Sequence, residues 1–167
     1  MPLTVRTITD SDIDEVAALH VRTWQVAYAG IVPAETLDGL DPAVFAAKRR
    51  DRPRLPDAAT FVAVEDGAVI GFANAGPRRD GDGGELYAIY VHPAHWRGGA
   101  GARLFEASVG HLREHGFPTM TLWVFEENPG ARAFYERMGM RPDGTREYYT
   151  PHGSTARLPE IRYEIRL

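Results

Sequence analysis

Short segments in which apolar and polar residues alternate are interleaved, along the whole chain, with longer segments in which apolar residues recur every three or four positions. The first pattern is typical of strands and the second of amphipathic helices. Strands are predicted at residues 3–8, 60–65, 68–75, 85–92, 119–124, 146–150 and 160–167. Helices are predicted at about 12–28, in one or two short pieces within 37–50, from the glycine-rich stretch at 98–101 to 116, and at 129–138.

Residues with special backbone preferences mark several of the boundaries. Asp66-Gly67 separates two alternating segments and predicts a β-hairpin. Asn128 followed by Pro129 predicts a helix start, and Gly139 is placed to end that helix. The order is one strand, then helices, then three strands, then helix, strand, helix and two strands. It predicts a single mixed α/β domain, residues 1–167, around one sheet.

Composition narrows the classes of function. A chain of 167 residues with 44% hydrophobic and 25% charged residues is typical of one globular domain. The net charge of −4 argues against nucleic acid or an anionic membrane as a partner. Because there is no cysteine, disulfides, cysteine-ligated metals and thiol nucleophiles are excluded.

The sequence also carries no targeting or membrane signal. The first twenty residues contain acidic side chains and lack the apolar centre of a signal peptide. No run of eighteen apolar residues occurs, so no membrane-spanning helix is predicted. We therefore expect a soluble, cytoplasmic protein.

The most informative segment, residues 85–105, runs from a predicted strand through Pro93 into Gly98-Gly99-Ala100-Gly101 at a predicted helix start. Glycines let N–H groups approach a ligand closely, and a helix start attracts phosphates. A nucleoside triphosphatase is disfavoured because no Gly-Lys-Ser/Thr is present. A dinucleotide fold is disfavoured because Leu104 stands where its third glycine belongs. Two interpretations of the glycine-rich segment remain: a binding site for the pyrophosphate of coenzyme A, and a turn with a purely structural role.

The same segment resembles the signature of the GCN5-related N-acetyltransferase family, in which a strand, V-x-P and R/Q-x-x-G-x-G/A lead into a helix. Val91-His92-Pro93 matches the first part of this signature. Residues 96–101, WRGGAG, match the second part, with Gly99 and Gly101 as the paired glycines.

One position departs from the family pattern. Trp96 stands where the family usually has Arg or Gln. A shift of one residue places Arg97 there but replaces both glycines by Ala100 and Ala102. The first register is therefore preferred.

A second stretch, residues 128–140 (NPGARAFYERMGM), is similar to the family's N-x-x-A-x-x-F-Y-x-x-x-G-F. An ordinary capped helix explains its capping residues and final glycine, but not a tyrosine directly after Phe134. Residues 24–33 also resemble a common bacterial branch of the family. The resemblance spans roughly the whole chain, and residues 85–140 are its diagnostic part. It implies a mostly antiparallel sheet flanked by helices, in which a splayed pair of strands holds acetyl-CoA.

Carried over residue by residue, the resemblance implies two catalytic groups. Glu85 corresponds to a base that removes the amine's proton through water, and the period of two along a strand places it on one face with Tyr87 and Ile89. Tyr135 corresponds to the general acid for the leaving thiolate. The simpler interpretations are a solvated glutamate at a strand end and a half-buried helix tyrosine.

The resemblance also implies how the donor is held. Backbone N–H groups of the strand at 85–92 would face the thioester oxygen and the pantetheine arm of the donor. The glycine turn at 98–101 and the helix capped by Asn128 would contact the remaining parts of the donor. The expected cofactor-binding residues are Ile89, Tyr90, Val91, Arg97, Gly98, Gly99, Ala100, Gly101, Ala102, Asn128, Ala131 and Tyr135.

The acceptor site is the least determined by the sequence. Trp24 and Tyr28 share a helix face in the region that lines the acceptor pocket in relatives, so they and Tyr87 are candidates. Packing in the core is the alternative for this pair. Weaker candidates are Phe72, Asn74, Tyr148, Tyr149 and His152. The histidine pairs at 92/95 and 111/115 lack a third ligand, so no metal is expected.

Together these residues predict an acetyl-CoA-dependent N-acetyltransferase that moves the acetyl group directly to the primary amine of a small molecule. Direct transfer is expected because no cysteine is available to carry the acetyl group. A peptide or protein amine is the alternative acceptor. The rival from another class is a non-catalytic acyl-CoA sensor, which needs the glycine turn but neither Glu85 nor Tyr135. Family members commonly form homodimers, and the sequence neither supports nor excludes one.

Overall fold

The computed structural model describes all 167 residues. The strands are β1 (Thr4–Thr7), β2 (Ala59–Glu65), β3 (Ala68–Pro77), β4 (Gly84–Val91), β5 (Thr119–Phe125), β6 (Arg141–Tyr149) and β7 (Leu158–Arg166). The helices are α1 (Ile13–Ala27), α2 (Ala34–Asp38), α3 (Pro42–Asp51), α4 (Ala100–Glu114) and α5 (Pro129–Arg137), with short 3₁₀ turns at Asp10–Asp12 and Pro93–His95. None of these helices combines the length and the apolar character needed to cross a membrane.

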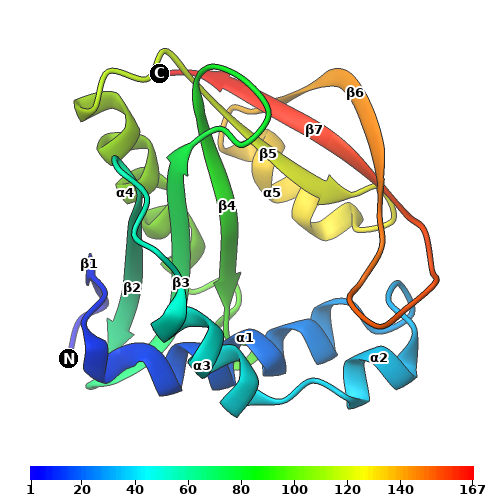
Figure 1. Cartoon of the computed structure of the whole chain (residues 1–167). Helices are drawn as coiled ribbons and strands as arrows, with labels where there is room; N and C mark the ends of the chain where they lie inside the picture. Colours follow the sequence, from blue (N-terminus) through cyan, green and yellow to red (C-terminus); the bar gives the residue numbers. More distant parts are fainter.

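All seven strands join one sheet in the order β1-β2-β3-β4-β5-β7-β6. Every neighbouring pair is antiparallel except β4 and β5. These two strands pair only at Gly84↔Met120 and Glu85↔Thr121 and then diverge, so the two halves of the sheet open like a V (Figure 1). The predicted fold class, a mostly antiparallel sheet flanked by helices with one splayed strand pair, is confirmed.

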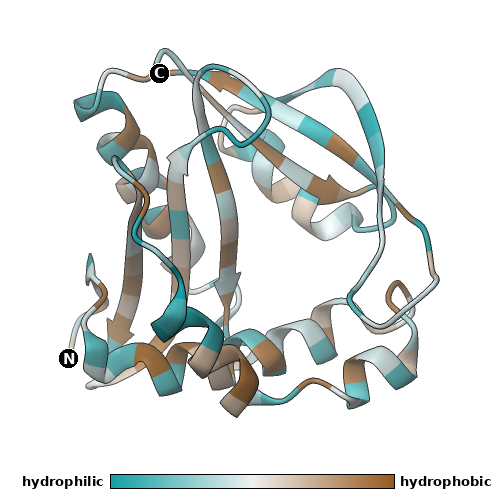
Figure 2. Ribbon diagram, in the orientation of Figure 1, coloured by the Kyte–Doolittle hydropathy of each residue, from teal (hydrophilic) through white to brown (hydrophobic).

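Helices cover the two faces of the sheet separately. α4 packs on β2, β3 and β4 from one side, and α1, with α3 against it, lies across the other side (Figure 1). The largest apolar cluster lies on the α4 side and includes Leu104 and Leu122, whereas a smaller cluster joins Val16 of α1 to Phe72 of β3. The strands carry much of the hydrophobic colouring in Figure 2, and the loop between β3 and β4 is hydrophilic.

A β-bulge interrupts β4 close to the point where the strands diverge. Consecutive residues of β3 pair with Ala88 and Leu86, which leaves Tyr87 as the extra residue. Strict alternation predicts Glu85, Tyr87 and Ile89 on one face, and this prediction is wrong for Ile89. Leu86 and Ile89 both contact the apolar cluster on the α4 side, because the bulge shifts the alternation by one residue.

The sixth strand begins earlier than its sequence predicts. β6 starts at Arg141, whereas the predicted strand begins at Arg146. The first half of β6 is polar and contains Pro142 and Gly144, which disfavour a strand locally. Pairing with β7, interrupted between Pro142 and Arg146, holds this half in the sheet.

Candidate active site

A cleft of about 1550 Å³ opens where β4 and β5 diverge and extends from the start of α4 to β6 and β7. Every residue predicted to be catalytic, cofactor-binding or acceptor-binding lines this cleft, except Gly98. Of the weaker acceptor candidates, Asn74 and Tyr149 line it and Phe72, Tyr148 and His152 do not. Sequence reasoning missed several charged and aromatic residues that also line it, among them Arg49, Arg52, Arg79, Trp123, Glu147 and Glu160.

The turn before α4 gathers backbone N–H groups at one end of the cleft. Arg97 and Gly99 adopt left-handed conformations, with φ of 67° and 88°, and Gly99 is the N-cap of α4. No side chain caps this helix, and the first hydrogen bond across the cap runs from the Arg103 N–H to the Gly99 carbonyl. The N–H groups of residues 100–102 therefore have no acceptor within the chain. Such a helix start is suited to binding an anion.

Two residues fix this turn against its neighbours. A Cβ on Gly101 would lie 3.3 Å from the Phe134 ring of α5, so glycine allows α4 and α5 to approach closely. The Trp96 indole N–H donates to the Val91 carbonyl at 2.7 Å and ties the turn to the end of β4. Trp96 thus has a structural partner at the position where the family motif has Arg or Gln.

The edge of β4 that faces β5 presents unpaired backbone groups. The His92 N–H donates to the Ile70 carbonyl, and hydrogen bonding alternates along an antiparallel ladder. The Tyr90 N–H therefore points toward β3, while the N–H groups of Ile89 and Val91 point into the gap. Of the three N–H groups predicted to contact the donor, the structure leaves two free to do so.

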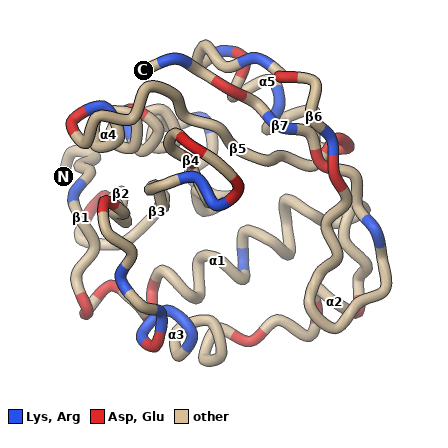
Figure 3. Tube along the Cα trace, turned by 45° about the horizontal axis from the view of Figure 1, so that its top comes forward, with Lys and Arg blue, Asp and Glu red and all other residues tan.

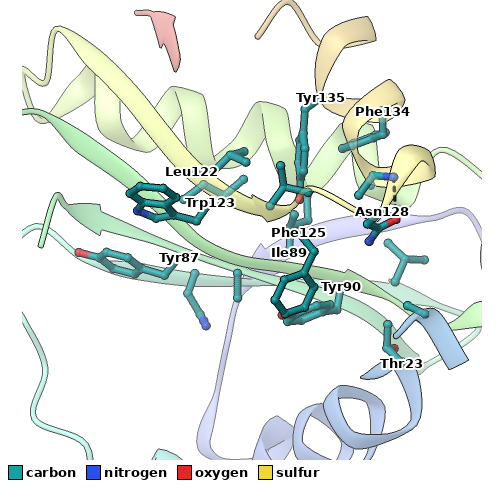
Figure 4. Close-up of a pocket in the computed structure, with 18 of the residues that line it drawn as sticks. Thr23, Tyr87, Ile89, Tyr90, Leu122, Trp123, Phe125, Asn128, Phe134 and Tyr135 are labelled. Atoms are coloured by element: carbon teal, nitrogen blue, oxygen red, sulfur yellow. Dashed lines mark hydrogen bonds between the residues drawn. The ribbon is translucent and has the colours of Figure 1, made fainter. Parts of the chain in front are cut away.

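Tyr135 projects from α5 toward the gap between β4 and β5 (Figure 4). Its ring packs against Phe134 and Tyr163, with centroid separations of 5.4 and 6.3 Å. Burial raises the pKa of Tyr135 well above its ordinary value, so the hydroxyl keeps its proton at neutral pH. A protonated phenol at this gap can donate to a leaving group.

Asn128 caps α5, as the sequence predicts. Its side-chain oxygen accepts a hydrogen bond from the Ala131 N–H at 3.2 Å (Figure 4), and Pro129 occupies the first turn. The Asn128 amide nitrogen donates to no group of the chain, and the residue lines the cleft. Capping and a contact with a bound molecule are therefore compatible.

Glu85 is 1% exposed and forms an ion pair with Arg79. Nε and Nη2 of Arg79 donate to both carboxylate oxygens at 2.9, 3.0 and 3.2 Å. This hydrogen bonding raises the pKa of Arg79, whose guanidinium also lies over the Tyr87 ring at 5.4 Å from its centroid. The Glu85 carboxylate is thus engaged with a permanent cation, and its role as a base stays a prediction.

A second carboxylate, Glu160 of β7, lies in the same cleft without a hydrogen-bond partner. It stands opposite Glu147 of β6 and Phe125 of β5 in the sheet. Burial and repulsion from Glu147 raise the pKa of Glu160 to about 7, with a smaller contribution from Glu85, while the cation of Arg79 opposes the rise. A carboxyl group that titrates near neutrality is well matched to accepting a proton from a reacting group.

Aromatic rings from α1, β4 and β5 form one wall of the cleft. Trp24 and Tyr28 share a helix face, as predicted, with ring centroids 5.0 Å apart. The Tyr28 hydroxyl donates to the Tyr90 hydroxyl at 3.3 Å, and the Tyr28 ring meets Phe125 edge-on at 4.8 Å. The rings pack together and also line the cleft, and their role in binding an acceptor stays a prediction.

The histidine pairs have other partners. His92 accepts a hydrogen bond from the Ala94 N–H, and His95 contacts the Glu65 carboxylate at 3.2 Å. His111 and His115 lie on α4 with their rings 4.2 Å apart. The chain contains no group of three or more His, Asp or Glu side chains placed to hold a metal ion.

Comparisons with known proteins agree with this geometry. Residues 18–140 match the family model described as "Acetyltransferase (GNAT) family". YuaI, an uncharacterized N-acetyltransferase of Bacillus subtilis, is 38% identical over 138 residues, covering 80% of this chain and 78% of that protein. A mycothiol acetyltransferase of Streptomyces avermitilis is 35% identical over 91 residues, covering 54% of this chain but 30% of that protein. The crystal structure of PaiA N-acetyltransferase from Thermoplasma acidophilum in complex with coenzyme A shares the fold, with a TM-score of 0.78, 18% identity and 100% coverage of both chains.

The splayed sheet, the open helix start and the cleft between them agree with the class that the comparisons indicate, an acyltransferase. The chain belongs to the acetyltransferase (GNAT) family. The family resemblance stated for residues 85–140 is confirmed, as is the prediction that the protein is an acyltransferase.

Proposed function

We propose that this protein transfers the acetyl group of acetyl-CoA directly to the primary amine of a small molecule. The observation that carries the proposal is the continuity of one cleft, which joins the free N–H groups of α4, the open edge of β4 and a carboxylate that titrates near neutrality. Membership of the family and the coenzyme A bound to the PaiA structure support the choice of donor.

The donor would be held mainly by the backbone. The N–H groups of residues 100–102 suit a pyrophosphate, because they are unpaired and lie at the positive end of a helix dipole. The N–H groups of Ile89 and Val91 would bind the pantetheine arm and the thioester oxygen, where negative charge develops during transfer. Asn128 would add its free amide nitrogen.

The donor supplies a thioester, and side chains of this chain would manage the protons. Glu160 would take the proton of the attacking ammonium, since the pKa of Glu160 is near 7 and its carboxylate forms no ion pair. As the amine nitrogen bonds to the acetyl carbon, the carbon–sulfur bond breaks and Tyr135 would protonate the departing thiolate. The second proton, which the nitrogen loses as it becomes an amide, would restore the proton of Tyr135. Glu85 remains the second candidate for the base, acting through water.

The first test is a thermal titration with acetyl-CoA, with NADH as the control nucleotide. A ligand that binds only the native state stabilises it by about 2.7 kcal/mol at a hundredfold excess over its dissociation constant. We expect a saturable rise in melting temperature with acetyl-CoA alone. No rise at millimolar acetyl-CoA would overturn the proposal. Amines are then screened by thiol release, to which a cysteine-free protein contributes no background.

Tyr135→Phe separates an enzyme from an acyl-CoA sensor. An enzyme that uses this hydroxyl loses turnover and still binds acetyl-CoA, whereas a sensor keeps its ligand response and has no turnover to lose. Comparing free amines with N-terminal peptide amines in the same thiol-release assay separates a small-molecule acceptor from a peptide.

A further inference from the structure

Arg49 of α3 is a partly buried cation on the wall of the cleft. Its guanidinium lies 5.0 Å from the centroid of the Phe72 ring, and Nη1 donates to Asn74 Oδ1 at 3.3 Å. Burial, with repulsion from Arg52, lowers the pKa of Arg49 to about 10, so the side chain stays charged at neutral pH. It belongs to the cluster of basic residues on α3 in Figure 3.

No carboxylate of the chain neutralises this charge. The neighbouring Arg50 pairs with Asp14 at 2.9 Å, whereas Arg49 and Arg52 form no ion pair and both line the cleft. Burial, together with these two cations, lowers the pKa of His20 to about 3, so its imidazole adds no positive charge here. Because a desolvated charge without a counter-ion is costly, the partly buried Arg49, with the exposed Arg52 beside it on the cleft wall, indicates an anion that comes from outside the chain.

Asn74 provides a second donor at the same place. Its side-chain oxygen accepts hydrogen bonds from the Thr60 hydroxyl at 2.8 Å and from Arg49, and a guanidinium can only donate, so the amide orientation is fixed. The amide nitrogen donates to no group of the chain and is left free beside the guanidinium. Asn74 pairs with Ala88 of β4, next to the bulge at Tyr87, so these donors lie beside the opening between the strands.

From this arrangement we infer that the acceptor amine also carries a carboxylate, which binds to Arg49 and Asn74 with Arg52 nearby. The inference rests on the proposed acetyl transfer and narrows its acceptor to amino acids and related zwitterions. A planar guanidinium beside an amide N–H matches the two oxygens of a carboxylate. Polycationic amines would meet two unneutralised arginines on this wall and are disfavoured.

The inference is tested by pairing each acceptor with its own carboxamide. Proteinogenic L-amino acids, β-alanine and 4-aminobutyrate are compared with their amides in the thiol-release assay. Since amidation also changes the basicity of an α-amine, the informative quantity is the acid-to-amide ratio of kcat/KM in each variant. We expect Arg49→Gln to lower this ratio by about tenfold or more through the KM of the acid, which measures the lost ground-state contact.

Two variants control for structural effects. Arg50→Gln removes the adjacent arginine, whose partner is the exposed Asp14, and should leave the ratio unchanged. Arg49→Lys keeps the charge without the planar fork and should give an intermediate ratio, even if Arg49→Gln fails to fold. An unchanged ratio in Arg49→Lys and in a folded Arg49→Gln would overturn the inference, as would turnover of carboxylate-free amines alone.

A binding measurement distinguishes this inference from the proposed function. N-acetyl-L-amino acids are added at millimolar concentration while the melting temperature is followed in the wild type and in the Arg49 variants. A rise confined to the wild type, without thiol release from any amine, would support the carboxylate site and overturn acetyl transfer. Thiol release without any preference for carboxylates would support acetyl transfer and overturn the carboxylate site. Absence of both the rise and the preference would overturn the carboxylate site.

Discussion

The two ends of the cleft are built from different parts of the chain. At the α4 end, the groups that face the cleft are backbone N–H groups, held in place by left-handed residues and by the close approach of Gly101 to Phe134. At the far end the groups that face the cleft are side chains from separate elements, including Arg49 of α3, Glu85 of β4 and Glu160 of β7. A backbone-built end is set by a few glycines in one local segment, whereas a side-chain-built end depends on how distant elements assemble.

This difference predicts how each end responds to substitution. Losing a side chain at the far end removes the chemical group itself and should change turnover or acceptor choice strongly. Losing a side chain at the α4 end leaves the N–H groups in place, so only a change in backbone conformation should weaken donor binding.

Tyr135→Phe should have the largest effect, because it removes the proposed proton donor from the gap between β4 and β5. General acid catalysis contributes about 10²–10⁴-fold, and we expect kcat to fall by about 10²-fold or more. The acetyl-CoA dissociation constant should change little, since the ring remains packed against Phe134 and Tyr163. Thiol release and thermal titration measure the two quantities separately. A variant with wild-type kcat would exclude this role.

Glu160→Gln should have the next largest effect. The wild-type kcat/KM should rise with pH through about 7, because the raised pKa keeps Glu160 protonated and unable to accept a proton below that value. The variant should lose about 10–100-fold in kcat/KM and the pH dependence with it. Glu85→Gln is the matched comparison and should lose less. A larger loss of kcat/KM in Glu85→Gln than in Glu160→Gln would indicate that Glu85, and not Glu160, is the base.

The same substitution should stabilise the protein at high pH. The native pKa of Glu160, about 7, exceeds its ordinary value of 4.5, so the folded chain holds this proton more tightly than the unfolded chain does. Ionisation therefore costs stability as the pH rises from about 4.5 to 7, and the cost persists above that window. In Glu160→Gln the free energy of unfolding at pH 8 should rise by about 1–2 kcal/mol, because solvent screens this partly exposed carboxylate, with little change at pH 4. Urea unfolding at both pH values measures the difference.

The sequence predicted the helix starts and caps around the α4 end because their determinants are local. Gly99, Gly101 and Asn128 lie in two short segments whose backbone requirements can be read directly from residue type. Glu160 and Arg49 gave no comparable signal, since each is one charged residue in a predicted strand or helix and becomes distinctive only when other elements pack around it. The face of Ile89 was missed for a third reason: the bulge at Tyr87 leaves no mark in the pattern of apolar residues.

Gly99→Ala tests whether backbone conformation controls the α4 end. An added Cβ meets nothing within 4 Å, so any effect must come from the strained φ of 88°. That strain is about 1–2 kcal/mol, and we expect the KM for acetyl-CoA to rise about fivefold. Gly110→Ala, inside the same helix and equally free of contacts, is the control and should gain about 0.5–1 kcal/mol with no change in KM. Equal KM values for the two variants would contradict the backbone interpretation.

Arg97→Gly should have the smallest effect on function. Unlike Gly99→Ala, it should stabilise the protein. Arg97 is exposed and holds a left-handed φ of 67°, a conformation that glycine adopts without strain. Relief of that strain, partly offset by the greater entropy of unfolded glycine, should raise the free energy of unfolding by about 0.5 kcal/mol. Because the N–H groups of residues 100–102 remain, the KM for acetyl-CoA should change by less than about threefold. Steady-state kinetics and urea unfolding test both statements. A KM raised beyond that limit would mean that the Arg97 side chain itself binds the donor. The α4 end would then depend on side chains, as the far end does, and not on backbone N–H groups alone.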